Sequence, residues 1–395
     1  MVEHLLDLGE DLIAEILTHL PTRSVLVARA VCIDFRSVAT SAAFLAAHAR
    51  CRPLAPLEIL LYDRTTAGHV DDYVYLDALS VSAELLGEQF CLPLASCDGL
   101  LLLGTAVASQ YLVSNPTTRQ WAELPRLRRQ HIEDGGRSLE SLHTSAYEES
   151  GFYFHEPSSE YRLLCHVTFE EGLPPAYYIF STGADEPRQL DNVKAGSMGD
   201  FFSPSSCDMI TPAVLRGYLH WLRHPEADSA GEMAAFDTAD ETFRRMPAPP
   251  MANELLARLL VADGSLMASG FRKLAMDLWV LEGYAGAASA SAGGTRWELR
   301  HSFEVPWQAR MPTSALVVIG GDEEGGVVLG PRHGVAVYNV RSGTVRAVDV
   351  GPKGSKGFRL TQGALRIRES LVRHTFFETQ RHPGIPSLYW RFCSC

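Results

Sequence analysis

The chain has 395 residues, enough for two domains or for one small module and one large repeat domain. Its net charge of −12 argues against binding to a nucleic-acid backbone, which normally requires a basic face. The eight cysteines are scattered without a CxxC pair, which argues against a disulfide framework or a zinc site, and we expect neither a metal nor a cofactor.

The first residues do not have the pattern of a signal peptide, because Glu3, Asp7, Glu10 and Asp11 interrupt the early apolar residues. No apolar run approaches the roughly 18 residues that a membrane span needs. We therefore expect a soluble intracellular protein, located in the cytoplasm, the nucleus or both.

Residues 5 to 50 carry a helical pattern. Apolar residues recur at the spacing of one helix face, at Leu12, Ile13, Ile16, Leu17 and Leu20. Pro21 ends this helix, and Ser24 is placed to cap the next one. A third helical stretch is predicted from Phe35 to Ala49.

After Arg52 and Pro53 the pattern changes to short apolar runs with a period of 2, which predicts strands. The predicted strands are 57–63, 73–79, 99–104, 111–115, 177–182, 217–222, 233–238, 277–283, 315–321 and 335–340. Two segments, 126–138 and 283–295, have the composition of loops, and the second is predicted to be a hairpin tip.

A weak repeat runs through this strand-rich region. Its markers are Trp121, Phe243, Trp297 and Val345, spaced about 50 residues apart except for a first gap that holds residues 143–190 as a divergent copy. Four-stranded units at this period predict a β-propeller of five or six blades. The fold class is mainly β with a small helical module, with domains at 1–50 and 51–395.

The helical module carries a specific set of residues: Leu8, Asp11, Leu12, Ile16, Leu17, Leu20, Pro21, Arg23, Ser24, Val31, Cys32, Phe35 and Phe44. In this pattern, residues 8 to 44 resemble an F-box, the module that docks a substrate receptor onto the Skp-type adaptor of a cullin–RING ubiquitin ligase. The chain departs from the usual pattern at Gly9, where the family has proline, and at Ile33, where it has a basic residue.

The strand-rich region carries a second series of landmarks. GLLLLG, NPTTRQWAELP, GYLHWL, FDTADETF, LWVLEG, VYNVRSG and ESLVRH occur in the order of a plant F-box-associated domain, which this region resembles. The resemblance extends from about residue 8 to 378. These landmarks belong to the scaffold of the domain, so they do not identify a site for a target protein.

A module of about 50 residues is too small to bury much apolar surface by itself, so its surplus apolar residues favour a partner surface. The resemblance implies that the adaptor contacts come from Leu8, Leu12, Ile13, Ile16, Leu17, Leu20, Pro21, Arg23, Ser24, Val31 and Phe35. The implied partners are a Skp-type adaptor, through it a cullin, and an unknown target protein, with no nucleic acid and no membrane.

The resemblance implies a non-catalytic substrate receptor of a Skp–cullin–F-box ubiquitin ligase, whose β-domain binds the target for ubiquitination. Segments 126–138 and 196–208 are candidate loops for that contact. The alternatives are a propeller-type enzyme or carbohydrate-binding protein, and an F-box scaffold that acts outside ubiquitination. The sequence contains no GxSxG elbow, P-loop or HExxH motif.

Three other features have a simpler explanation beside a functional one. Asn115 to Thr118 favours a turn over a ligand pocket, with Trp121 in a blade core. His220 and His224 have the i, i+4 spacing of a metal pair, but in a strand these side chains do not converge. Only four of the 35 basic residues are lysines, all of them in the β-domain; this could slow self-ubiquitination, although codon bias is the simpler explanation.

Overall fold

The computed structural model describes most of the helical module and the strands that follow it. The described residues are 9–51, 59–61, 74–75, 82–83, 91–105, 110–115, 117–118, 120–127, 133–134, 137–138, 144–169, 176–190, 212–222, 231–251, 257–272, 275–286, 294–304, 317–321, 325–330, 335–348, 365–366, 369–379 and 390–391. Within them, no helix is long and apolar enough to span a membrane.

The helical module begins with two short helices, α1 (Glu10–Thr18) and α2 (Thr22–Ala28). The prediction that Ser24 caps the second helix is wrong, because α2 begins two residues earlier. Pro21 occupies the N-cap position, and its carbonyl accepts the first helical bond from the Val25 amide at 3.1 Å. The ring of proline restricts its backbone in advance and so supports this early start.

The predicted third helical stretch is two helices, α3 (Ile33–Thr40) and α4 (Ala42–Cys51). Ser41 separates them because its backbone is extended, and its hydroxyl accepts a bond from the Phe44 amide at 3.3 Å. The thiol of Cys32 accepts a weaker bond from the Phe35 amide at the start of α3. Short polar side chains thus set both helix starts, as is usual for caps.

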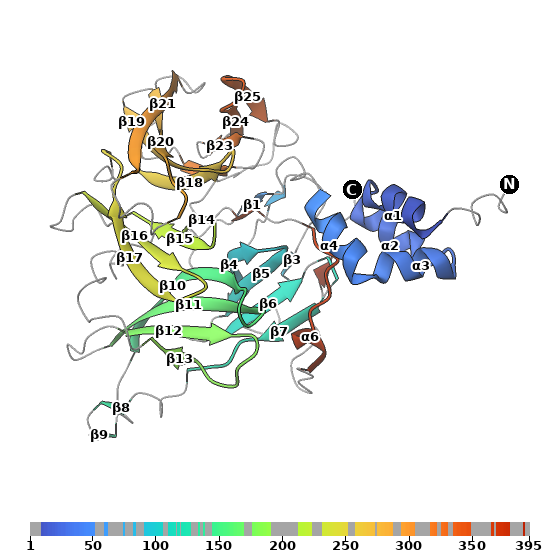
Figure 1. The fold of residues 1–395 in the computed structure, drawn as a ribbon. Coiled ribbons are helices and arrows are strands. Elements are labelled where there is room, and N and C mark those ends of the chain that lie inside the picture. The colour runs from blue at the N-terminus through green and yellow to red at the C-terminus, as the bar shows by residue number, and fades with distance from the viewer. Residues whose placement is uncertain are drawn as a thin grey trace.

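Five antiparallel four-stranded sheets follow the helical module and form the blades of a propeller (Figure 1). Blade 1 is β4 (Cys91–Cys97), β5 (Leu100–Thr105), β6 (Tyr111–Asn115) and β7 (Gln120–Glu123). Blade 2 is β10 (Thr144–His155), β11 (Glu160–Phe169), β12 (Ala176–Ser181) and β13 (Arg188–Gln189). Blade 3 is β14 (Ala213–Leu215), β15 (Tyr218–Trp221), β16 (Glu232–Asp237) and β17 (Thr242–Pro247).

The last two blades have the same order of strands. Blade 4 is β18 (Arg258–Ala262), β19 (Ser265–Arg272), β20 (Ala275–Glu282) and β21 (Arg296–Glu304). Blade 5 is β22 (Val317–Gly321), β23 (Gly326–Gly330), β24 (Val335–Asn339) and β25 (Thr344–Val348). The prediction of a propeller is confirmed, residues 143–190 do contain a blade, and all four repeat markers lie in the fourth strand of a blade.

The sequence repeat has a physical cause at the end of the third strand of three blades. There an Asn or Asp side chain accepts bonds from two backbone amides of the following turn, two and three residues further on. These residues are Asn115 in blade 1, Asp237 in blade 3 and Asn339 in blade 5, with donor–acceptor distances of 2.9 to 3.2 Å. Asn and Asp recur here because a short side-chain oxygen reaches these amides.

Strands from both ends of the β-domain pair with one another. β1 (Ile59–Leu61) lies between β2 (Val74–Tyr75) and β26 (Leu365–Arg366), and β3 (Ser82–Ala83) pairs with β27 (Trp390–Arg391). β26 also contacts β4 of blade 1. A separate small hairpin, β8 (Glu133–Asp134) with β9 (Arg137–Ser138), lies within the predicted loop 126–138.

The core lies between neighbouring blades. One cluster joins Leu100 and Leu102 of blade 1 to Leu163 and Phe180 of blade 2. Other clusters join blade 2 to blade 3, blade 3 to blade 4, and blade 4 to blade 5. The buried indole of Trp221 in blade 3 adds a polar contact, donating to the Ser150 carbonyl of blade 2 at 2.9 Å. The two sheets in each of these four pairs therefore bury apolar faces against one another.

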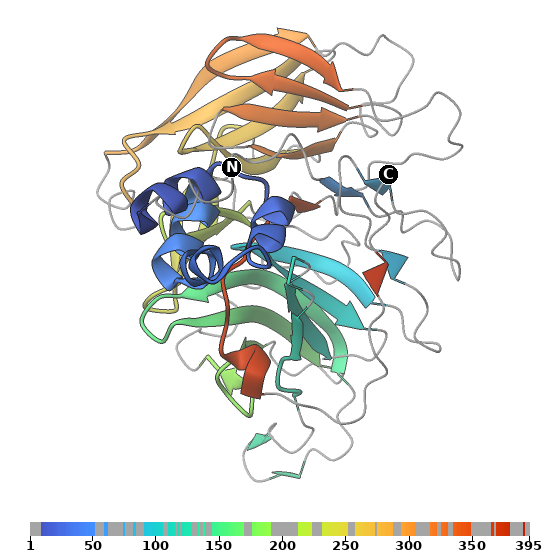
Figure 2. The same cartoon turned by 90° about the vertical axis from the view of Figure 1, so that its right-hand side faces the viewer.

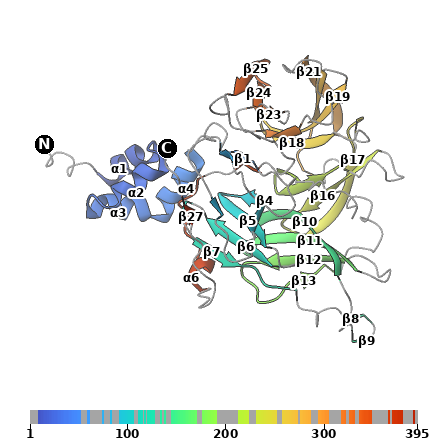
Figure 3. The same ribbon diagram turned by 180° about the vertical axis from the view of Figure 1, so that it is seen from behind.

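The helical module lies at one edge of the propeller, beside blade 1 and the short helix α6 (Phe376–Thr379) (Figures 1 and 3). In Figure 2 the red segment that leads to α6 passes from the blue helices to the cyan and green blades. The segment that leads to α6 thus contacts both the helical module and the propeller.

The capping side chains make a testable contribution to stability. We expect Asp237→Ala to lower the free energy of unfolding by about 2 kcal/mol, because two turn amides lose their acceptor. Urea denaturation followed by tryptophan fluorescence measures the change. Asp237→Asn is the matched control, since it keeps the accepting oxygen; an unchanged midpoint for Asp237→Ala would contradict the role of this side chain.

Candidate functional site

The first helix divides its apolar residues between two environments. Ile13 and Leu17, four residues apart, are buried in the core of the module. Leu12 and Ile16, also four residues apart, remain 55% and 49% exposed. Residues at this spacing share one side of a helix, so α1 has an apolar side facing solvent in addition to the one that faces the core.

The second helix and the connection after it add further exposed apolar side chains. Leu26 and Val27 lie in α2, Val31 lies in the connection, and Ile33 begins α3 with 82% of its surface exposed. Six of the nine exposed large apolar residues among the described residues belong to this short part of the chain. The exposed apolar set is Leu12, Ile16, Leu26, Val27, Val31 and Ile33.

Two arginines hold the connection that carries Val31. Arg29 donates to the Ala39 carbonyl at 2.8 Å, and Arg36 donates to the Arg29 carbonyl at 3.0 Å. Burial and the nearby charge of Arg373 lower the pKa of the Arg29 guanidinium. These bonds tie α2 to α3 and thereby fix the backbone on either side of the exposed Val31.

The predicted adaptor-binding residues occupy three kinds of position. Leu8 lies outside the described residues. Ile13 and Leu17 are interior, while Leu20 and Phe35 are partly buried against the same core. Leu12, Ile16, Pro21, Arg23 and Val31 are exposed, and Ser24 is half-buried. The predicted set omitted three exposed apolar residues, Leu26, Val27 and Ile33. In α2, Val25 and Ala28 take the core positions and leave Leu26 and Val27 on the outside.

The core of the module contains a residue that the sequence did not suggest. Leu371, near the C-terminal end, is 1% exposed and packs with Ile13, Leu17, Val25 and Phe44. Val372 packs against the same cluster. The only signal for this contact is the apolar Leu-Val pair within the ESLVRH landmark.

On the propeller, the loops predicted to receive a target are only partly described. Within 126–138 the structure describes residues 126–127 and the β8–β9 hairpin, and 196–208 lies outside the described residues. Their role in binding a target therefore stays a prediction.

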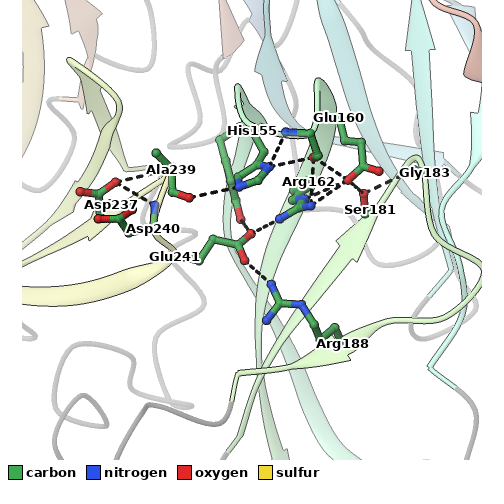
Figure 4. A network of polar contacts seen from close by, with 12 residues as sticks. His155, Glu160, Arg162, Ser181, Gly183, Arg188, Asp237, Ala239, Asp240 and Glu241 are labelled. Atoms are coloured by element: carbon green, nitrogen blue, oxygen red, sulfur yellow. Dashed lines mark hydrogen bonds and ion pairs between the residues drawn. The ribbon is translucent and has the colours of Figure 1, made fainter.

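A network of polar contacts joins blades 2 and 3 (Figure 4). Arg162 donates to Glu160 of its own blade at 2.8 Å and to Glu241 of blade 3 at 2.5 Å. Arg188 pairs with the other oxygen of Glu241, and Tyr153 donates to Glu241 at 2.8 Å. Two carboxylates thus face two guanidinium groups.

Each of these carboxylates and guanidinium groups has an oppositely charged partner within the network. Burial alone would raise the pKa of Glu241, but hydrogen bonds from Arg162 and Tyr153 and the charges of Arg162 and Arg188 lower it overall. His155 contacts Ser158 at 2.8 Å and donates to the Ala239 carbonyl at 3.2 Å. The geometry is that of a contact between blades, with both carboxylates held ionised rather than poised for acid–base chemistry.

His220 is occupied by hydrogen bonds inside blade 3. Its Nδ1 lies 2.9 Å from the Ala213 carbonyl, which can only accept, so Nδ1 carries the proton and Nε2 accepts from the Tyr284 hydroxyl at 2.6 Å. His224 lies outside the described residues. Within the part of the chain that the structure describes, no group of three His, Cys, Asp or Glu side chains could hold a metal ion.

Two families match this chain. Residues 80–306 match the F-box associated beta propeller domain, and residues 5–46 match the F-box domain. An F-box protein of Arabidopsis thaliana is 24% identical over 309 residues, which cover 70% of this chain and 69% of that protein.

Two solved structures are similar to this chain, with low TM-scores. The extracellular domain of a one-component system of B. thetaiotaomicron has a TM-score of 0.33 and 12% identity, covering 73% of this chain and 30% of that chain. A catalytically inactive virginiamycin B lyase of Staphylococcus aureus has a TM-score of 0.31 and 8% identity, covering 67% of this chain and 89% of that chain.

The buried imidazole of His220 predicts a loss of stability in acid. Burial lowers its pKa to about 4, from 6.5 for an unperturbed ring, so the folded protein keeps this ring neutral while the unfolded chain binds a proton. The neutral ring therefore adds to the free energy of unfolding above pH 6.5. This stabilisation, up to about 3 kcal/mol, is lost as the pH falls towards 4.

Denaturation midpoints between pH 7 and pH 4 measure this dependence. We expect stability to decline less steeply with falling pH in His220→Gln than in the wild type. His19→Gln, at the exposed C-cap of α1, is the control. Parallel curves for His220→Gln and the wild type would contradict the assignment.

Proposed function

This chain belongs to the F-box associated beta propeller family and begins with an F-box domain, and from this premise we propose that it is the substrate-recognition subunit of a Skp–cullin–F-box ubiquitin ligase. The helical module binds a Skp-type adaptor, and the adaptor binds a cullin. The propeller binds the protein that is to be ubiquitinated, in the cytoplasm, the nucleus or both.

The observation that supports this proposal most strongly is the exposed apolar set. Large apolar side chains gather on the helical module, although such groups normally avoid water when no partner covers them. Helices commonly present apolar residues four positions apart, such as Leu12 and Ile16, to a groove on another protein. The module therefore has apolar side chains left over outside its own core, and a partner could cover them.

The propeller supports the second half of the proposal. Its blades are held to one another by buried clusters and by contacts such as Arg162 to Glu241, which make a firm scaffold for loops. Loops on a firm scaffold are the usual place for variable recognition. The chain needs no catalytic group of its own, because holding a target near the conjugating enzyme raises the effective concentration of its lysines.

The small number of lysines supports a further hypothesis, that the protein is protected from its own ubiquitination. Lys194, Lys273, Lys353 and Lys356 all lie outside the described residues. If scarcity slows self-ubiquitination, lysines added on the surface of the helical module should shorten the half-life of the protein in cells. An unchanged half-life would leave codon bias as the explanation.

Adaptor binding is the direct test of the proposal. We expect the double substitution Leu12→Ala and Ile16→Ala to weaken binding of a purified Skp-type adaptor by tenfold or more. A tenfold loss of affinity corresponds to about 1.4 kcal/mol of binding free energy. Calorimetry or surface plasmon resonance gives the affinity. Both side chains are half-exposed, so the fold should be retained, which circular dichroism checks.

The matched control is the pair Val214→Ala and Leu299→Ala, which removes exposed apolar side chains from the propeller instead. It should leave adaptor affinity within a factor of about two. Failure of the intact wild-type chain to bind the adaptor, or equal loss in both double variants, would contradict the proposal.

A further inference from the structure

Two landmarks of the sequence are in contact in the structure, although the residues that join them are 255 positions apart. The side-chain amide of Asn115, in the NPTT turn of blade 1, donates to the Ser370 carbonyl at 3.1 Å. The Ser370 amide in turn donates to the Thr117 hydroxyl at 3.4 Å. Asn115 and Ser370 are both buried, so neither partner can exchange this contact for water.

The other blades show which part of Asn115 has this additional role. In blade 3, Asp237 accepts the two equivalent turn amides through one oxygen, so the turn needs no side-chain amide. Asn115 makes the same two bonds through Oδ1 to Thr117 and Thr118. Its Nδ2 takes no part in the turn and instead donates to the C-terminal segment, at the Ser370 carbonyl.

Directly after Ser370 the chain enters the helical module. Leu371 lies in the core formed by Ile13, Leu17 and Phe44, and Val372 packs beside it. Arg373 follows, and its charge lies close enough to Arg29 of the module to contribute to the lowered pKa of that guanidinium. Like charges repel, so the apolar contacts and not this pair hold the segment against the helices.

The segment then returns to the propeller. The His374 ring packs edge-on against Tyr161 of blade 2 at 5.2 Å between centroids, and Phe376 packs on the same tyrosine at 6.1 Å. Phe376 and Phe377 also pack against the apolar cluster shared by blades 1 and 2. Residues 369–378, the C-terminal joint, thus contact the module through Leu371 and Val372, and the propeller on both sides of them.

We propose that the C-terminal joint completes the core of the helical module and fixes the module to blades 1 and 2, so that the module is not an independent unit. Asn115 holds the joint to blade 1, and Leu371 holds the joint to the helices. A consequence, which rests on the proposed function, is that adaptor binding depends on residues at the other end of the chain.

Amide hydrogen exchange of the full-length chain, read by mass spectrometry, tests the joint without any partner. Asn115→Asp keeps the oxygen that the turn amides need but places a second acceptor against the Ser370 carbonyl. We expect exchange in residues 369–378 and in α1 and α4 to accelerate by tenfold or more, a change of about 1.4 kcal/mol in local opening. Blades 3 to 5 should keep wild-type rates.

Asn339→Asp is the matched control, because it makes the same chemical change at the equivalent turn of blade 5. It should leave the exchange of the joint and of α1 and α4 unchanged. If Asn115→Asp opens β5 and β6 as fast as the joint, or leaves the joint as protected as in the wild type, the proposed role of Asn115 is wrong.

Leu371 gives a second test that does not involve the turn. Leu371→Ala should accelerate exchange in α1 and α4 by a similar factor, whereas Leu371→Met, which conserves most of the side-chain volume, should restore protection. Arg373→Ala, on the exposed side of the joint, should not accelerate it. Unchanged exchange of the helices in Leu371→Ala would overturn the proposal.

The functional consequence is measured with a purified Skp-type adaptor. We expect Leu371→Ala to weaken adaptor binding by tenfold or more and Leu371→Met to stay within a factor of about two. Equal affinities for Leu371→Ala and the wild type would refute the dependence of adaptor binding on the joint. A wild-type chain that binds no adaptor would refute the proposed function instead. The exchange rates would still decide whether the joint stabilises the helical module.

Discussion

The structure depends on apolar packing between neighbouring blades. A four-stranded sheet has two faces and two edges, and a single blade cannot remove its apolar faces from water. Here Trp221 and Phe236 of blade 3 pack on Tyr153 and Ile179 of blade 2. Comparable clusters join blades 1 and 2, blades 3 and 4, and blades 4 and 5. Polar contacts such as Arg162 with Glu241 are added beside these clusters, where their charges are compensated. Each blade is therefore stable only as part of the row.

The helical module is subject to the same constraint, and it meets it in two ways. Part of its apolar surface is covered from within the chain, by Leu371 and Val372 of the C-terminal joint. Another part, including Leu12, Ile16 and Ile33, stays in solvent. The first arrangement attaches the module to the propeller, and the second leaves it able to bind a partner. The proposed role, in which a target is held near a conjugating enzyme, would use both properties, an uncovered docking surface and a firm attachment.

Local patterns in the sequence predicted most elements, because helix and strand periods depend on neighbours within a few residues. The predicted strands at 111–115 and 335–340 are β6 and β24 almost residue for residue. Boundaries were less accurate: Ser24 lies inside α2, and Ser41 divides one expected helix into two. The bond from Asn115 to Ser370 was beyond any local pattern, because it joins residues 255 positions apart. The turn at Asn115 itself was predicted correctly.

The sequence by itself determined that a short helical module precedes a repeated, strand-rich domain, and its motifs placed both parts in known families. It also determined which residues of α1 are apolar, since the spacing of Leu12, Ile13, Ile16 and Leu17 is visible without coordinates. Only the tertiary structure decided which of them face the core. Ile13 and Leu17 are buried because α3, α4 and Leu371 pack on their side of the helix, whereas Leu12 and Ile16 stay about half exposed among the residues that the structure describes. Burial is set by what packs against a residue, and that includes residues from the far end of the chain.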